Sequence, residues 1–220
     1  LKNIVYFPIQ QIEKFLYNIQ STGVDPNMGI GDNPFFPIWY FANLTTNWRD
    51  DLSVDYLFEI ESSKSDIDWL KKHLTALEEQ ALYNADIAQG REIYRFTWLR
   101  SFQKPICIRI EKNADDYSLF WKEGELVSGY EPKGLGSDKA KKISEDEWKK
   151  FKETLNKLNF DRLPNEEYVL MSSGASWTLE KKTSAIYKAH KTNVPEKTIK
   201  ESCIFLIKLS DLKINEEEIY

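Results

Sequence analysis

The chain contains few of the residues that carry metal and thiol chemistry. Its 220 residues include two cysteines and two histidines. Two cysteines are too few for a disulfide framework, and the four residues are too scattered to match the ligand spacing of a zinc site. We therefore expect no metal site and no cofactor.

Long apolar runs and an excess of positive charge are also missing. No apolar segment reaches the roughly 18 residues that a transmembrane helix needs, so we expect a soluble chain without a transmembrane segment. Lysine and arginine number 30 against 35 aspartates and glutamates, which gives a formal net charge of −5. Proteins that bind nucleic acid usually carry a basic excess or stripe, so we expect no nucleic-acid partner.

The start of the chain leaves the location of the protein open. The first residue is Leu1 and not methionine. A removed leader peptide and a trimmed start both account for this. The protein is therefore expected in the cytoplasm or, if a leader has been removed, in the periplasm or at the cell surface.

The hydrophobic fraction of 41% and the aromatic fraction of 14% indicate a folded globule. Residues 1–90 form a mainly helical N-terminal region in our interpretation. Apolar residues recur at helical spacing over 8–21 and again over 65–88, and the segment 23–37 between them has the glycine and proline content of a loop. We expect this region to pack beside the rest of the chain as one compact unit.

The hydrophobic period changes at Gly90, and residues 91–220 predict a sheet domain. Segments 92–102, 105–112 and 116–122 alternate between apolar and polar residues, which predicts a three-strand antiparallel meander. Residues 175–190 predict a late hairpin. The glycine-rich segment 123–142 is interpreted as a loop.

Two helices are expected in the same half. Ser144 and Glu147 form a capping-box pattern ahead of an apolar stripe, and a last helix follows Pro195 and carries Cys203 inward. The fold class is therefore α+β: an antiparallel sheet of about five strands, made of the meander and the late hairpin. Helices should pack on its aromatic face, with the helical N-terminal region alongside.

Alternation along each strand divides the side chains between two faces of the sheet. Phe96 and Trp98 point to an aromatic face, which Trp177 and Tyr187 of the late hairpin join in our assignment. The opposite, polar face is expected to gather Arg95, Arg109, Glu111, Thr178, Glu180, Lys188 and His190.

Arg100 is the unusual member of the aromatic face. Its planar guanidinium could stack on Trp98 while it reaches a carboxylate, since a buried charge without a partner costs several kcal/mol, roughly. Two interpretations follow. Arg100 belongs to a structural ion pair near the sheet edge, or it binds an anion or carboxylate at the mouth of a pocket.

One catalytic arrangement can be built from the expected polar face. Cys107, Glu180 and His190 supply a thiol, a carboxylate and an imidazole, the parts of a cysteine hydrolase site. No local signature surrounds Cys107, and residues 171–177 lack a serine-hydrolase elbow. A hydrolase with these three residues is therefore the alternative hypothesis.

Several segments in a fixed order resemble an uncharacterised bacterial protein family over roughly residues 92–220. They are YRFTWLRSFQKPICIRIE (94–111), SGYEPKGL (128–135), SEDEWKKF (144–151), SWTLE (176–180) and the terminal EIY (218–220). The resemblance implies no activity. It implies that one spatial cluster contains Arg95, Trp98, Arg100, Trp177, Glu180 and Tyr187.

The leading functional hypothesis is a non-enzymatic bacterial binding or interaction protein. Its partner is an unknown protein or a small anionic ligand, and it binds on the polar sheet face or on the glycine-rich segments 23–37 and 123–138. The candidate ligand-binding residues are Arg95, Trp98, Arg100, Arg109, Trp177, Glu180 and Tyr187.

Overall fold

The computed structural model describes residues 67–83, 85–126, 131–164, 166–167, 174–195 and 198–219. The predictions over 8–21 and 23–37 lie outside these residues, and the division into domains at residue 90 stays a prediction. The strands are β1 (Glu92–Arg100), β2 (Ile106–Asn113), β3 (Asp116–Leu126), β4 (Pro132–Lys142), β5 (Glu166–Glu167), β6 (Ala175–Thr183) and β7 (Tyr187–Thr192). The helical elements are a helix over 67–76, α3 (Glu145–Leu158), the short 3-10 helix η2 (Phe160–Arg162), α4 (Lys200–Leu209) and the 3-10 helix η4 (Glu216–Glu218).

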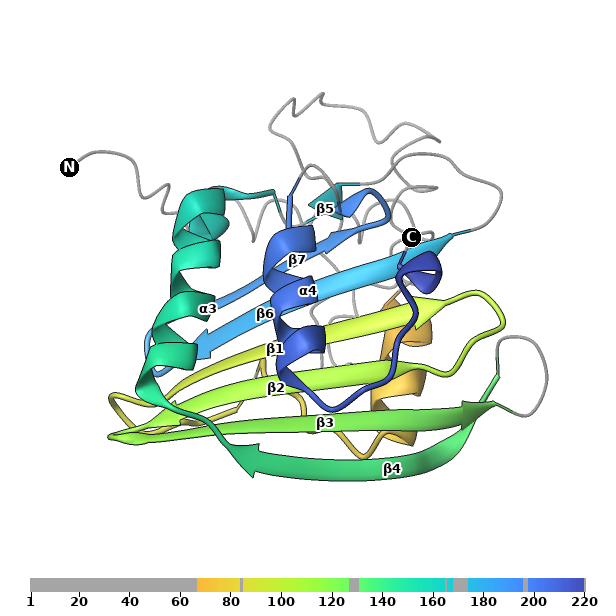
Figure 1. Cartoon of the computed structure of the whole chain (residues 1–220), viewed down its shortest axis with the longest axis horizontal. Coiled ribbons are helices and arrows are strands. Elements are labelled where there is room, and N and C mark those ends of the chain that lie inside the picture. Colours follow the sequence, from red (N-terminus) through yellow and green to blue (C-terminus); the bar gives the residue numbers. More distant parts are fainter. Residues whose placement is uncertain are drawn as a thin grey trace, which may run out of the picture.

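The strands form one sheet in the order β4-β3-β2-β1-β6-β7-β5 (Figure 1). Six of them are antiparallel neighbours, and the two-residue β5 runs parallel to β7. The α+β class, the three-strand meander and the late hairpin are confirmed. Two strands, β4 and β5, add to the five that were expected.

The interpretation of residues 123–142 as a loop was wrong. β3 continues to Leu126, and β4 pairs with it from Leu126↔Pro132 to Ser118↔Lys142. The strand depends on that pairing and not on its own propensity, because its composition is rich in glycine and lysine. A Cβ on Gly136 would lie 3.1 Å from the Glu123 carbonyl oxygen, so glycine permits the irregular pairing at this end.

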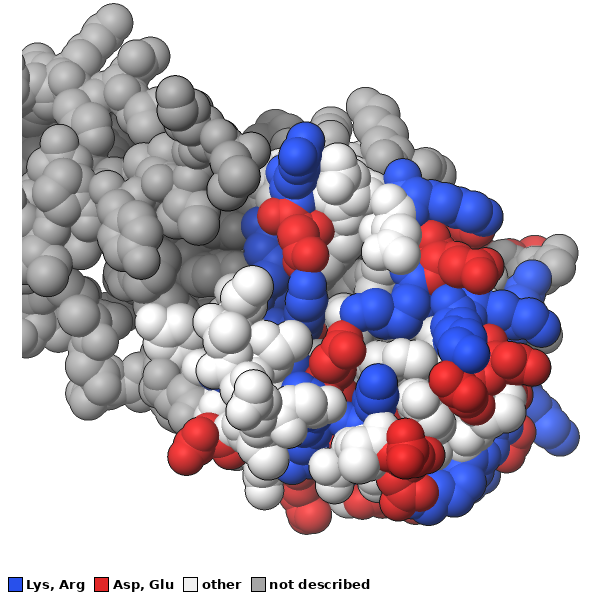
Figure 2. Space-filling model, turned by 90° about the vertical axis from the view of Figure 1, so that its left-hand side faces the viewer, with Lys and Arg blue, Asp and Glu red and all other residues white. Residues whose placement is uncertain are grey.

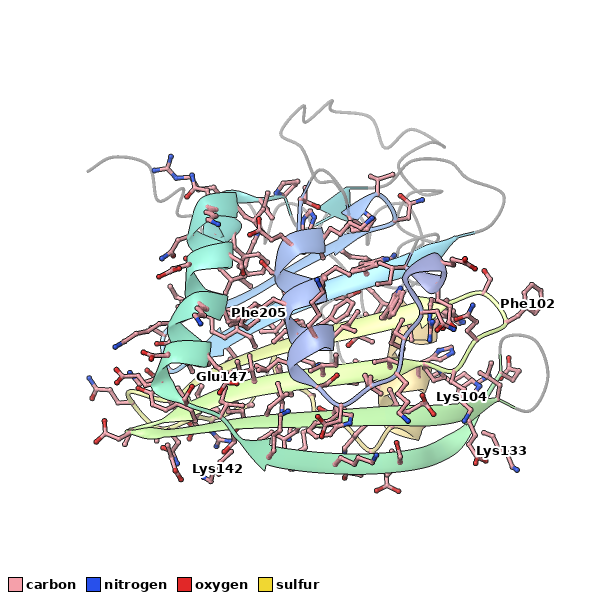
Figure 3. The ribbon with its side chains drawn as sticks, viewed as in Figure 1. Phe102, Lys104, Lys133, Lys142, Glu147 and Phe205 are labelled. Atoms are coloured by element: carbon pink, nitrogen blue, oxygen red, sulfur yellow. The ribbon has the colours of Figure 1, made fainter. Side chains whose placement is uncertain are left out.

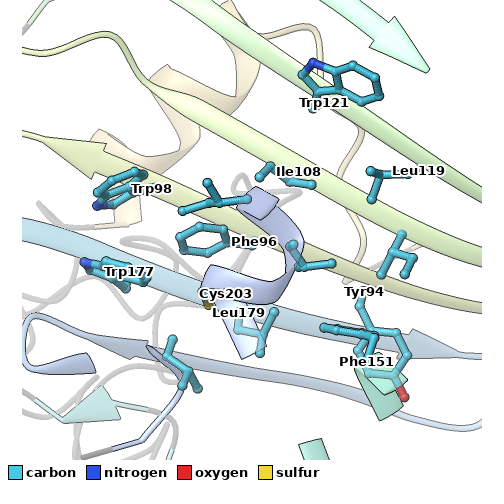
Figure 4. Close-up of a cluster of buried hydrophobic side chains, with 14 of the residues drawn as sticks. Tyr94, Phe96, Trp98, Ile108, Leu119, Trp121, Phe151, Trp177, Leu179 and Cys203 are labelled. Atoms are coloured by element: carbon cyan, nitrogen blue, oxygen red, sulfur yellow. The ribbon is translucent and has the colours of Figure 1, made fainter. Parts of the chain in front are cut away.

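The main core lies between the sheet and the two helices α3 and α4, which pack on the same face (Figure 1). Phe96, Trp98 and Trp177 form its centre, and the centroids of the two indoles lie 5.0 Å apart (Figure 4). All three side chains are fully buried. The expected aromatic face under helices is confirmed, and Cys203 of α4 is buried in it as predicted.

Helix α3 begins at the predicted capping box. The Glu147 N–H donates to Ser144 Oγ at 3.2 Å, and the Ser144 N–H donates to Glu147 Oε2 at 2.7 Å. These bonds satisfy backbone donors that a helix start otherwise leaves without partners. They also hold the pKa of Glu147 below its usual range, because the carboxylate accepts the backbone and hydroxyl bonds of Ser144.

The opposite face of the sheet is covered by helix 67–76 and by the chain that follows it, residues 77–83 and 85–90, which we call the covering segment (Figure 1). Leu70, Leu74 and Leu77 pack there with Leu99 and Cys107 of the sheet. The prediction of a helix over 65–88 was therefore right about the buried face, but the helix ends at residue 76 and not at residue 88.

The helix ends early because Glu78 adopts a left-handed backbone conformation, with a φ of 53°. The Glu79 N–H then donates to the Leu74 carbonyl at 2.9 Å, and the Glu78 N–H donates to the Thr75 carbonyl at 3.0 Å. These two bonds form a Schellman cap. Glycine or asparagine is usual at the left-handed position, so a glutamate there carried no stop signal in the sequence.

Replacing Glu78 with glycine should stabilise the fold by about 1 kcal/mol, because glycine adopts a left-handed conformation without the Cβ clash. Thermal unfolding measures the effect. Glu78→Ala is the matched control, since it removes the same exposed side chain and keeps the Cβ. Equal stability of the two variants would contradict the strain at this position.

Candidate functional site

The predicted polar face exists, and its centre is a buried ion pair. Arg95 donates from Nε to Glu180 Oε2 at 2.6 Å and from Nη2 to Glu180 Oε1 at 2.8 Å, and both side chains are fully buried. Tyr187 donates to Glu180 Oε1 at 3.0 Å. Burial by itself would lower the pKa of Arg95, but attraction to the charge of Glu180 has the larger effect and raises the pKa above its usual value. The guanidinium therefore stays charged.

The covering segment adds a second carboxylate to this face. Glu79 lies 2.6 Å from Arg109, 3.3 Å from Lys122 and 3.5 Å from Arg95. Burial would raise the pKa of Glu79, but attraction to the three cations outweighs it and lowers the pKa. The covering segment is therefore attached to the sheet through a counter-ion that three strands share.

Protein groups thus occupy the polar face. Arg109 also donates to Glu111 at 2.6 Å, and Arg91 donates to the same carboxylate at 2.7 Å. Each of these arginines meets a carboxylate of the chain itself. Arg95 and Arg109 therefore attach the covering segment to the sheet, through Glu79 and, for Arg95, through the Gln80 carbonyl as well. Glu180 is the counter-ion of Arg95 within the sheet.

Arg100 makes the stack and the ion pair that the structural interpretation requires. Its guanidinium carbon lies 4.1 Å from the centroid of the Trp98 ring, and its Nη1 lies 3.2 Å from Glu218 Oε2 of η4. The side chain of Arg100 is 4% exposed. A carboxylate from the end of the chain therefore occupies the position that the second interpretation assigned to a ligand.

The six residues of the expected cluster divide between the two faces of the sheet. The register pairs Arg95 with Glu180 and Trp98 with Trp177. Because side chains alternate along a strand, the two pairs point to opposite sides. One group therefore contains Arg95, Glu180 and Tyr187, and the other contains Trp98, Arg100 and Trp177.

The assignment of His190 and Lys188 to the polar face was wrong, as was that of Tyr187 to the aromatic face. His190 pairs with Leu179, which belongs to the main core, and Lys188 pairs with Lys181 on the same side. The length of the turn decides which side chains of the second strand point to which face of the sheet. An error of one residue in that length moves every side chain of the strand to the opposite face.

The parts of the cysteine hydrolase alternative are therefore not brought together. His190 hydrogen-bonds to the Pro164 carbonyl at 2.6 Å and to Thr198 Oγ1 at 3.2 Å, on the α3 and α4 side of the sheet. Cys107 lies on the other side, packed among leucines. Burial raises the pKa of its thiol, which favours the neutral thiol over the thiolate that a cysteine nucleophile requires.

A cavity of about 90 Å³ lies between α3 and the sheet, lined in part by Tyr94, Lys152 and Lys181. Its lysines already have partners. Lys152 donates to Glu92 at 2.7 Å, and Lys181 donates to both oxygens of Asp161 at 2.7 Å. The cavity offers no free cation to a small anionic ligand from these two side chains.

Within the described part of the chain, β4 is an edge strand of the sheet. β4 pairs with β3 on one side, and no strand of the described part of the chain pairs with its other side. At the opposite edge, by contrast, β5 covers Lys191 and Thr192 of β7. We call β4 residues Ser137–Lys142, where the ladder is regular, the β4 edge.

The β4 edge is basic and exposed. Figure 3 shows Lys133 and Lys142 near the two ends of β4. Their side chains are 63% and 67% exposed. Lys142 pairs with Asp116 at 2.7 Å, and Lys141 pairs with Asp211 at 3.2 Å. Lys139 makes no ion pair within the described residues.

Comparisons with known proteins add no activity to these observations. No protein-family model matches the chain, and no curated protein matches it. Among the residues that the structure describes, no helix is long and apolar enough to cross a membrane, and no three His, Cys, Asp or Glu side chains are placed to hold a metal ion.

Proposed function

We propose that this protein is a non-enzymatic interaction protein that binds an extended segment of a partner protein as an added strand on β4. The observation that carries the proposal is the eleven-residue strand β4 at the edge of the sheet, with no strand on its outer side in the described chain. Such an edge presents a row of backbone N–H and C=O groups, which an extended peptide can pair with.

The rest of the described sheet supports this choice. One face is packed under α3 and α4, and the ion network with the covering segment fills the other. Figure 2 shows the described part of one side of the molecule, on which Lys and Arg are interspersed with Asp and Glu and no large patch carries a single sign of charge. A mixed surface of this kind favours a local docking edge over broad electrostatic binding of a polyanion.

Proline substitution in the β4 edge should separate binding from folding. Neighbouring residues of an antiparallel strand direct their N–H groups to opposite sides, so one of Lys139→Pro and Ala140→Pro removes an outward donor. That variant should fold normally and bind an extended peptide at least about tenfold more weakly, whereas the other variant should lose stability. The probe is a fluorescein-labelled peptide that alternates valine with threonine, measured by anisotropy.

The control peptide has the same sequence with N-methyl groups on alternate residues, which blocks one side of its backbone. It should not bind. Equal binding to the wild type and to the folded proline variant would overturn the proposal, as would the absence of binding by neutral, acidic and basic extended peptides alike. If both proline variants unfold, slower hydrogen exchange of the amides in Ser137–Lys142 when peptide is added to the wild type decides the same question.

A further inference from the structure

We infer that the segment recognised by the β4 edge is acidic, with carboxylates at alternate positions. This inference rests on the proposed function. Lys139 and Lys141 are two residues apart, so they lie on one face of the strand, opposite Trp121 and Leu119 of β3. A strand added outside β4 would place every second side chain beside these lysines, at a Cβ separation of roughly 5 Å.

Both lysines are available to such a partner. Lys139 is exposed and forms no ion pair with a carboxylate of the described residues. Lys141 pairs with Asp211, whose side chain is 68% exposed, and its ammonium lies 5.7 Å from the centroid of the Trp121 ring. An exposed pair of this kind contributes little to stability, so Lys141 can exchange Asp211 for a carboxylate on the added strand.

The other face of the edge defines the positions between the acids. Ala140 pairs with Phe120 there and presents only a methyl group. The flanking charges have partners of their own, since Lys142 pairs with Asp116 and Asp138 lies 3.8 Å from Lys122. A small or apolar side chain therefore fits opposite Ala140, and the recognised motif is acid, apolar residue, acid.

The extent of the regular ladder limits the length of the motif, and the two lysines disfavour a second copy of the chain as the partner. The regular ladder ends at Ser137, where the register with β3 shifts. Two copies paired antiparallel about Ala140 would place Lys139 of each beside Lys141 of the other. Like charges directly opposite one another on neighbouring strands are destabilising. The same register would place Asp138 of each copy beside Lys142 of the other, but these two side chains already pair with Lys122 and Asp116. The repulsion between Lys139 and Lys141 therefore favours an acidic partner over a second copy.

Three peptides test the inference: valine alternating with glutamate, with glutamine or with lysine, each titrated against the wild type at low salt. The glutamate peptide should bind about tenfold more tightly than the glutamine peptide, because it gains two opposite-charge cross-strand pairs. The lysine peptide should bind most weakly. The preference should fade at high salt.

The variant Lys139→Glu/Lys141→Glu should reverse the order and prefer the lysine peptide. The matched control is Lys149→Glu/Lys157→Glu, which makes the same change in net charge at two exposed lysines of α3. It should keep the wild-type preference. A control that reverses the order as well would show that net charge, and not the β4 edge, selects the peptide, and would overturn the inference.

Two further outcomes distinguish the inference from the proposed function. Equal, backbone-dependent binding of the glutamate and glutamine peptides would overturn the acidic motif and leave strand addition standing. Binding of none of the peptides would overturn strand addition itself. A dimer in sedimentation that disappears in the folded proline variant would show that a second copy occupies the edge, which also overturns the acidic motif.

Discussion

Replacing Glu180 with glutamine should destabilise the fold by about 3–5 kcal/mol, because it leaves the guanidinium of Arg95 buried without its main counter-ion. Glutamine is similar in size, so the loss reports charge and hydrogen bonding and not packing. Glu180 accepts two bonds from Arg95 and one from Tyr187, and an amide has one oxygen to replace both carboxylate oxygens. Chemical denaturation measures the change.

The double variant Arg95→Met/Glu180→Leu is the comparison for Glu180→Gln. It removes both buried charges, and Glu79 keeps Arg109 and Lys122 as partners. Replacing a buried ion pair with apolar side chains of similar size is often close to neutral, so the double variant should be more stable than Glu180→Gln. Arg95 also donates from Nη1 to the Gln80 carbonyl and lies 3.5 Å from Glu79. If the double variant is the less stable of the two, Arg95 contributes more through these two contacts than through Glu180.

Truncating Trp98 to alanine should cost about 3–5 kcal/mol, because the indole is fully buried at the centre of the aromatic core. Its ring centroid lies 5.0 Å from that of Trp177 and 6.3 Å from that of Phe96. The substitution also removes the ring beneath Arg100. Thermal or denaturant unfolding of the purified variant gives the value.

Trp98→Phe is the matched control, and it should cost much less, below about 1.5 kcal/mol. The indole N–H of Trp98 is buried and makes no hydrogen bond to the described part of the chain, so its removal gives up no bond there. Phenylalanine keeps a ring for Arg100 to stack on. A loss as large as that of alanine would contradict this account and would show that the N–H has a partner that the fold needs.

These two predictions concern the packing on both faces of the sheet, behind the β4 edge that we propose as the binding site. The ion network attaches the covering segment to β1, β2 and β3, and the aromatic core holds α3 and α4 on the other face. A sheet fixed on both faces would present β4 as a preorganised template for the proposed partner strand, and preorganisation lowers the entropic cost of binding. Stability variants in the core should therefore leave peptide selectivity at the β4 edge unchanged wherever they remain folded.

The proposed binding edge was not predicted from the sequence. Residues 123–138 were expected to contribute to binding as a glycine-rich loop, and this range meets the β4 edge only at residues 137–138, so it leaves out Lys139 and Lys141. No apolar alternation marks Ser137–Lys142, because both faces of an edge strand at this position meet solvent. The only available signal was the position of the segment, directly after an alternating strand and separated from it by a short turn.

Local patterns by themselves determined the elements whose causes lie within a few residues. Ser144 and Glu147 start α3 because the bonds of a capping box are made within one turn. Alternation over 92–102 and 105–112 separated the core face from the polar face, because burial acts directly on every second side chain. The stack of Arg100 on Trp98 followed from the cost of an unpaired buried charge.

Tertiary structure alone decided the features whose causes are distant in sequence. The left-handed cap at Glu78 persists because the chain beyond it delivers Glu79 to cations on three strands. The turn after β6 set the face of His190, and pairing with β3 made a strand of β4. These interaction energies arise between two segments that are distant in sequence, so the local sequence of either segment does not reveal them.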